Sequence, residues 1–150
     1  MTPINRRSLL GLALSFPALP ALAFREPVFL DGQGVAIRGY DPVAYLETED
    51  ALRGSMDHEL ETDDAIWRFS SAEHLKMFRK SPAKYTPQFG GYCAEAMARG
   101  YKRRSDPTLW VMVDRKIYLH YSIPDQNRWA DDIRGNIRLA QDNWKRIRDL

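Results

Sequence analysis

The segment WRFSSAEHLKMF, residues 67–78, changes its side-chain periodicity partway along and so indicates the fold class. In its first half Trp67 and Phe69 alternate with polar residues, which is the pattern of a half-buried strand. In its second half Leu75 and Phe78 lie three residues apart, a spacing that places both on one face of a helix. Together with the hairpins and the long helix described below, this segment predicts one domain of the α+β class.

The serines between the two halves predict how the helix begins. Ser70 or Ser71 is expected to cap it, and Ser70 with Glu73 three residues later matches a capping box. The helix should end at Ser81-Pro82, because proline disfavours helical geometry in the residue before it. Residues 81–91 that follow are expected to form a loop.

Two hairpins and one long helix are expected around this segment. Residues 58–70 form the first hairpin, turning at Asp63-Asp64, and residues 108–122 form the second, turning at Asp114-Arg115. A helix beginning at Pro124-Asp125 carries a regular apolar stripe made of Trp129, Ile133, Ile137, Ala140, Trp144 and Ile147. The sequence therefore predicts a small single α+β domain with two β-hairpins, packed helices and a long amphipathic C-terminal helix.

The chain before the first hairpin is less regular. Residues 24–39 are expected to be an extended lead-in with a turn at 31–34. In GYDPVAYL, residues 39–46, Asp41 before Pro42 suits the cap of a short helix. The same residues also fit a short strand with Val43 and Tyr45 on one face.

The first 23 residues have the pattern of an export signal rather than of a folded domain. Arg6-Arg7 precedes an uncharged run that ends in the small-residue pattern Ala21-Leu22-Ala23. The run is too short and too rich in proline for a convincing membrane span, although an uncleaved N-terminal anchor is the alternative. The segment NRRSLLG resembles the twin-arginine export motif. We expect a periplasmic protein whose domain covers residues 24–150.

Charge and composition exclude several classes of function. The chain has 22 basic and 20 acidic residues, and removing Arg6 and Arg7 with the signal leaves equal numbers. The domain therefore lacks the net positive charge that favours nucleic-acid binding. No serine triad, phosphate-binding loop or dinucleotide fingerprint is present, so we expect a protein that is not an enzyme.

The only cysteine lies in FGGYCAEAMARG, residues 89–100. Gly90 and Gly91 leave room for close approach of another backbone or of a ligand. A helix beginning at Tyr92 or Ala94 would place the Cys93 sulfur near free N–H groups, which favour the thiolate. This placement predicts a reachable, ionisable thiol. The alternative is a buried cysteine that acts as a small apolar side chain.

Several segments together resemble the exported branch of the YHS domain family: GYDPVAYL (39–46), WRFSSAEHLKMF (67–78), SPAKYTPQFGGYCAEAMARG (81–100) and DPTLWVMVDRKIYLHYS (106–122). The resemblance implies a core like that of treble-clef metal-binding modules and a role in handling metals. Trp67 stands where the family name has tyrosine, His74 matches its histidine, and Ser70 and Ser71 match its serines. With a single cysteine, a closed four-cysteine zinc site is impossible within one chain.

Three functions follow as hypotheses. The first is a periplasmic metal-binding or metal-handling module in which Cys93 binds a soft metal such as Cu(I). The candidate ligands are Cys93, His74, His120 and Met97, and Asp41 and Tyr92 are further candidate site residues. The second is a module that holds a small ligand or a periplasmic protein partner in an aromatic-lined pocket, with a buried, unreactive Cys93. The third is a thiol redox sensor or enzyme, which needs His74 or His120 beside the sulfur.

Overall fold

The structure is a computed structural model that describes residues 27–62 and 65–150. Strand β1 (Ser55–Glu61) pairs with β2 (Ile66–Phe69), and β3 (Asp106–Val113) pairs with β4 (Lys116–His120), both antiparallel. The helices are α1 (Ala44–Glu47), α2 (Ala72–Lys80), α3 (Pro82–Tyr85), α4 (Ala94–Ala98), α5 (Ile123–Asp131) and α6 (Ile133–Ile147), with 3-10 turns η1 (Ile37–Gly39) and η2 (Gln88–Gly91). The predicted α+β class with two hairpins and a long C-terminal helix is confirmed.

Two sequence-based expectations fall on residues that the structure does not describe. These are the export signal at residues 1–23 and the turn at Asp63-Asp64. Across residues 27–62 and 65–150, no helix is both long enough and apolar enough to cross a membrane.

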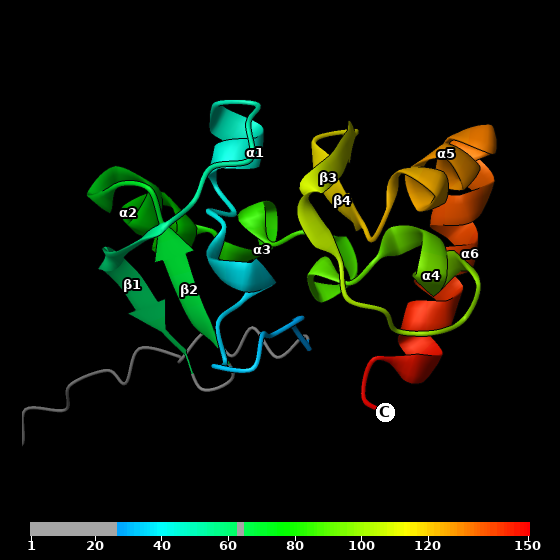
Figure 1. Ribbon diagram of the computed structural model, residues 1–150, viewed down its shortest axis with the longest axis horizontal. Helices are drawn as coiled ribbons and strands as arrows, with labels where there is room; N and C mark the ends of the chain where they lie inside the picture. The colour runs from blue at the N-terminus through cyan, green and yellow to red at the C-terminus, as the bar shows by residue number, and fades with distance from the viewer. Residues whose placement is uncertain (1–26, 63–64) are drawn as a thin grey trace, which may run out of the picture.

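The β3–β4 hairpin stands between two groups of elements and divides the hydrophobic core (Figure 1). Its strand β4 sends alternate side chains to opposite sides, as a strand must. Ile117 and Leu119 pack into a cluster with Trp67, Phe69 and residues of α1 and α2. Tyr118 packs into a second cluster with residues of α4 and α6 and with Trp129 of α5. The predicted core face of the first hairpin, Trp67 and Phe69, is confirmed.

The short helix α1 settles the alternative at GYDPVAYL. Asp41 accepts hydrogen bonds from the backbone nitrogens of Val43 at 2.8 Å and Ala44 at 3.4 Å. Val43 occupies the cap position, so Asp41 holds the turn that leads into the helix, close to the role that the helical alternative predicts. The turn at Asp114-Arg115 is also confirmed, since both residues have positive φ, 50° and 56°, as a two-residue hairpin turn demands.

The predicted capping box at α2 is wrong. Ser71 is the cap, because its hydroxyl accepts from the backbone nitrogen of His74 at 3.1 Å. Ser70 lies one residue before the cap position, and its hydroxyl donates to the Asp41 carboxylate at 2.6 Å. The loop expected at residues 81–91 also differs, since it contains helix α3 and turn η2.

The predicted single C-terminal helix is two helices. Asp132 breaks it with a non-helical backbone (φ −150°, ψ 75°), and its carboxylate then caps α6 by accepting from the nitrogen of Gly135 at 2.9 Å. The break leaves the apolar stripe intact. Trp129, Ala140 and Trp144 are buried in the second core cluster, and Ile133, Ile137 and Ile147 are partly buried and pack against it.

Candidate functional site

Cys93 lies at the cap position of α4 and is completely buried. Its backbone nitrogen donates to the carbonyl of Arg103 at 2.9 Å, and it forms an isolated parallel bridge to Leu119 of β4. The expectation that this sulfur is reachable from solvent is therefore wrong. The segment after η2 runs inward between β4 and the loop at Arg103, and this path encloses the residue.

Burial also decides the ionisation of the thiol. Desolvation raises the pKa of Cys93, while the backbone N–H groups of Ala96, Tyr121 and Glu95 act in the opposite direction. The net shift is upward, so the predicted lowering of this pKa is wrong. Helix α4 has only five residues, and so short a helix supplies little dipole to offset the loss of hydration.

The two glycines before Cys93 serve the fold. A Cβ added to Gly90 would lie 1.9 Å from the carbonyl oxygen of Pro27, and one added to Gly91 would lie 2.5 Å from Ile37. Both glycines have positive φ, 61° and 82°, a region that favours glycine. The sequence predicts that these glycines admit either another backbone or a ligand. At Gly90 the structure shows another backbone, that of Pro27.

The four candidate metal ligands have different environments. Met97 is fully buried in the second core cluster, with Cys93 at the start of its helix. His120 is also fully buried, with its ring centroid 5.5 Å from that of Trp129. The Nδ1 atom of His74 is hydrogen-bonded to Asp41. Within the described ranges, no group of three or more His, Cys, Asp or Glu side chains could hold a metal ion.

His120 is a buried polar side chain without a hydrogen bond. Neither ring nitrogen has a partner among the described residues. Desolvation lowers the pKa of His120 to about 4, and the nearby Asp125 carboxylate opposes this only in part. The imidazole is therefore neutral at pH 7. Thiol catalysis would require a hydrogen bond between the Cys93 sulfur and an imidazole. His120 does not form this bond in the described part of the chain, because both of its ring nitrogens are unpaired.

Asp41 and His74 belong to a separate hydrogen-bonded cluster with Ser70. The buried Asp41 carboxylate accepts from the nitrogen and hydroxyl of Ser70 at 2.8 and 2.6 Å, and it lies 2.6 Å from Nδ1 of His74. Together with the bonds to α1, these contacts tie the start of α1 to the start of α2. None of the hydrogen bonds recorded for Asp41 joins it to Cys93, so its role in the described chain is to connect two helices.

Tyr92, the remaining candidate, is half-buried beside the aromatic residues of α6 and the lead-in segment. Its ring centroid lies 6.3 Å from that of Trp144 and 5.7 Å from that of Phe29, and Lys102 lies over the ring with its Nζ 5.7 Å from the centroid. Burial raises the pKa of Tyr92. Tyr92 therefore packs against Trp144, which lines the pocket described next.

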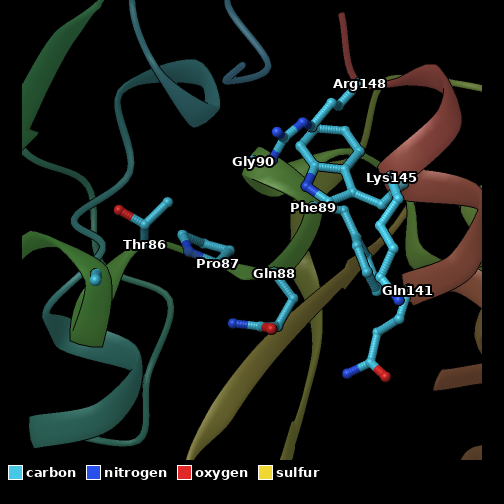
Figure 2. A pocket seen from close by; sticks show the side chains of 10 residues that line it. Thr86, Pro87, Gln88, Phe89, Gly90, Gln141, Lys145 and Arg148 are labelled. Atoms are coloured by element: carbon cyan, nitrogen blue, oxygen red, sulfur yellow. The ribbon is translucent and has the colours of Figure 1, made fainter. Parts of the chain in front are cut away.

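A pocket of about 510 Å³ lies between the segment around η2 and the last turns of α6. Figure 2 shows Thr86, Pro87 and Gln88 on one side of it and Gln141, Lys145 and Arg148 on the other. The full lining is Ala83, Thr86, Pro87, Gln88, Phe89, Gly90, Gln141, Trp144, Lys145 and Arg148. Its volume falls in the range of sites that enclose one small molecule, about 300–1,000 Å³.

The pocket combines an aromatic wall with polar ends. The rings of Phe89 and Trp144 meet nearly edge-on, with centroids 6.2 Å apart and planes at 65°. Phe89 itself has a left-handed backbone (φ 56°), which the two following glycines continue. Amides from Gln88 and Gln141 and the cations of Lys145 and Arg148 supply the polar groups.

The sequence interpretation missed this pocket. The hypothesis of an aromatic-lined pocket names none of the residues that line this one. The available signal was the placement of Gln141, Trp144, Lys145 and Arg148 at helical spacing, which makes one face of aromatic and cationic side chains. The pairing of that face with residues 86–90 has no local signal, because the two segments are far apart in sequence.

Comparison of the chain with known protein families, with curated proteins and with solved structures found no match.

Proposed function

We propose that the domain is a non-enzymatic binding module that holds a small ligand in the pocket between η2 and α6. The observation that carries this proposal is the pocket itself, an aromatic-walled cavity of about 510 Å³ with polar groups at its ends. Such pockets, apolar with a few placed polar groups, are the usual form of small-molecule sites. The complete burial of Cys93 supports the same proposal, since this hypothesis requires an unreactive thiol.

A fragment screen followed by nuclear magnetic resonance tests this proposal. Binding fragments should shift the backbone amide signals of Phe89, Gly90 and Gln141 together. The variant Gln141→Trp fills the pocket from an exposed lining position and should abolish the shifts. Leu139→Trp, which alters an exposed residue of the same helix that does not line the pocket, should leave them unchanged. Fragment shifts that cluster elsewhere would refute the proposal.

A soft-metal site at Cys93 remains a second proposal. The backbone N–H groups of Glu95, Ala96 and Tyr121 that face the sulfur partly offset the desolvation that raises its pKa, and a thiolate is a ligand that Cu(I) prefers. Titration of Cu(I) into the mature protein and into the Cys93→Ala variant measures how much of the Cu(I) binding depends on the thiol. Stoichiometric binding that disappears in the variant supports the metal site, and equal, negligible binding in both ends it.

We further propose that the protein is exported to the periplasm and belongs to the YHS family with a treble-clef-like core. The support is the Arg6-Arg7 pair with the uncharged run after it and the order of the quoted motifs. Replacing both arginines with lysine in the full chain should retain the protein in the cytoplasm if the twin-arginine route is used. Unchanged export of that variant would refute the route.

A further inference from the structure

Two arginines and a tyrosine form a cationic cluster at the end of β4, and none of the three lines the pocket. Arg103 and Arg104 lie in the loop before β3, and Tyr121 directly follows β4. The guanidinium carbon of Arg103 lies 3.5 Å from the centroid of the Tyr121 ring, and that of Arg104 lies 5.5 Å from it. One ring therefore gathers two cations and concentrates positive charge on a small area of surface.

Most of the hydrogen-bonding capacity of the two guanidinium groups stays open. Hydrogen bonds from Arg104 and Arg103 to the phenol lower the pKa of Tyr121. A guanidinium that lies over a ring uses its face there and keeps its other N–H donors in one plane at its edge. Arg104 is exposed, and no acidic side chain of the described residues pairs with it.

The one carboxylate beside the cluster neutralises it only in part. Arg103, whose side chain is 37% exposed, lies 3.5 Å from the buried carboxylate of Asp125. Asp125 already accepts a hydrogen bond from the hydroxyl of Ser122 at 2.7 Å and is paired with Arg128. A contact at 3.5 Å is at the long limit of a hydrogen bond, so Arg103 keeps donors for a second anion.

The loop that carries the arginines is fixed to the rest of the domain. The carbonyl of Arg103 accepts from the backbone nitrogen of Cys93 at 2.9 Å, and the buried hydroxyl of Ser105 donates to the carbonyl of Gly91 at 2.6 Å. The ammonium of Lys102 donates to carbonyl oxygens at the end of the chain, after α6. The two guanidinium groups are therefore held in place before a ligand arrives, which reduces the entropy lost on binding.

Exposed apolar surface borders the cations. Tyr101 is 48% exposed and Ile123 is 61% exposed. Tyr101 stands two residues before Arg103 and Ile123 two residues after Tyr121, so each lies within about 7 Å of the cluster along the backbone. Arginine and tyrosine beside apolar surface is the composition of the centre of a protein–protein interface.

We propose that this face, made of Tyr101, Arg103, Arg104, Tyr121 and Ile123, docks an acidic segment of a protein partner. Carboxylates of the segment lie against the two guanidinium groups, whose planar donors match a carboxylate through two parallel hydrogen bonds. Membrane surfaces and nucleic acids are bound through larger sets of cations, about four or more, and here two guanidinium groups are available. The face is a second binding site that does not depend on the pocket.

Three probes test the face: an octapeptide of alternating Asp and Glu, its amide analogue of alternating Asn and Gln, and vesicles of phosphatidylglycerol. Each is titrated into the unmodified protein and followed through the side-chain Nε–H signals of Arg103 and Arg104 by nuclear magnetic resonance. The acidic peptide should bind at least about tenfold more tightly than the amide analogue, as charge-assisted hydrogen bonds imply. Added salt should reduce this preference, because exposed charges are screened.

A charge-matched pair of variants separates this face from positive charge in general. Arg103→Gln with Arg104→Gln should lose the preference for the acidic peptide. Arg79→Gln with Lys80→Gln removes two adjacent exposed cations at the end of α2 and should keep it. Tyr121→Leu retains both arginines but removes the ring that gathers them, so it should weaken binding of the acidic peptide about threefold or more. Circular dichroism verifies that the variants are folded.

Equal binding of the two peptides, or unchanged binding of the acidic peptide by the double arginine variant, would overturn the proposal. Vesicle binding through the same arginines without peptide binding would also overturn it and assign the face to a membrane. Undiminished binding by Tyr121→Leu would overturn the role of the ring. These outcomes are independent of the pocket, whose occupation is followed at the amide signals of Phe89 and Gln141.

Discussion

The buried thiol and the open pocket lie on either side of the same turn, yet their environments are opposite. Cys93 follows η2 into the core and has no exposed surface. The pocket of about 510 Å³ lies between η2 and α6. Phe89 at its base is only 5% exposed, and Gln141 and Lys145 on its α6 side are exposed. The residue with the most reactive chemistry is therefore enclosed, and residues with ordinary chemistry line the open site. Accessibility, which depends on the path of the chain, decides which of them can meet a ligand.

Magnitudes explain why the helix terminus does not activate Cys93. A helix end contributes about 0.3–1 kcal/mol to a nearby charge, and α4 has only five residues. Burial of an ionised group costs several times more, so desolvation dominates and the pKa of the thiol rises. A glycine pair before a cysteine is thus weak support for a reactive site when both glycines are needed by the packing.

The largest expected effect is protection of Cys93 from thiol reagents. Because the sulfur has no exposed surface, iodoacetamide should modify it only after local or global opening of the domain. The native rate should be slower than the rate in concentrated urea by a factor of about a thousand or more, as a stability of several kcal/mol implies. Modification of the native protein at the rate of a free thiol would show that Cys93 is accessible and that its environment does not differ from that of the pocket as described.

The next effect concerns the turn that separates the two regions. Gly90→Ala would place a Cβ 1.9 Å from the oxygen of Pro27 and force alanine to a φ of 61°. We expect a loss of about 4 kcal/mol of unfolding free energy, measured by urea denaturation. Gly32→Ala is the matched control, since its added Cβ meets nothing within 4 Å, and its cost should stay below about 1 kcal/mol. Similar urea midpoints for the two variants would contradict this account of η2.

A smaller effect, on the order of 3 kcal/mol, should follow pH through the buried His120. Its pKa is lowered from 6.5 to about 4 in the folded protein, so the unfolded chain binds a proton more readily. Stability should therefore be lost as pH falls from about 6.5 toward 4, by about 1.4 kcal/mol for each pH unit. His120→Leu should remove this part of the pH dependence. Thermal unfolding of both proteins across that range provides the measurement, and identical pH profiles would refute the assignment to His120.

Much of the fold was predictable because it depends on local periodicity. The alternation at Trp67 and Phe69 gave the first hairpin, and the stripe from Trp129 to Ile147 gave the C-terminal helices. The break at Asp132 was missed because an aspartate inside a regular stripe gives no strong signal, and its capping bond to Gly135 depends on backbone geometry. Ser70 was misassigned for a related reason, since its partner Asp41 is 29 residues away.

The candidate site was much less predictable than the fold. Chemical type alone predicts Cys93, His74, His120 and Met97 as candidate metal ligands. In the structure His74 is bonded to Asp41, while the other three are completely buried. The pocket forms from residues 83–90 and from α6, whose contact depends on tertiary packing. Residue type alone carries no information about such a contact.

The central claim is that ligand binding takes place in the pocket and does not depend on the thiol. The most direct measurement is titration of the best fragment from the screen into the unmodified protein, Cys93→Ala and Gln141→Trp, followed by nuclear magnetic resonance. We predict equal dissociation constants, within about twofold, for the first two proteins and no binding to the third. Loss of binding in Cys93→Ala, with full binding retained in Gln141→Trp, would contradict the claim.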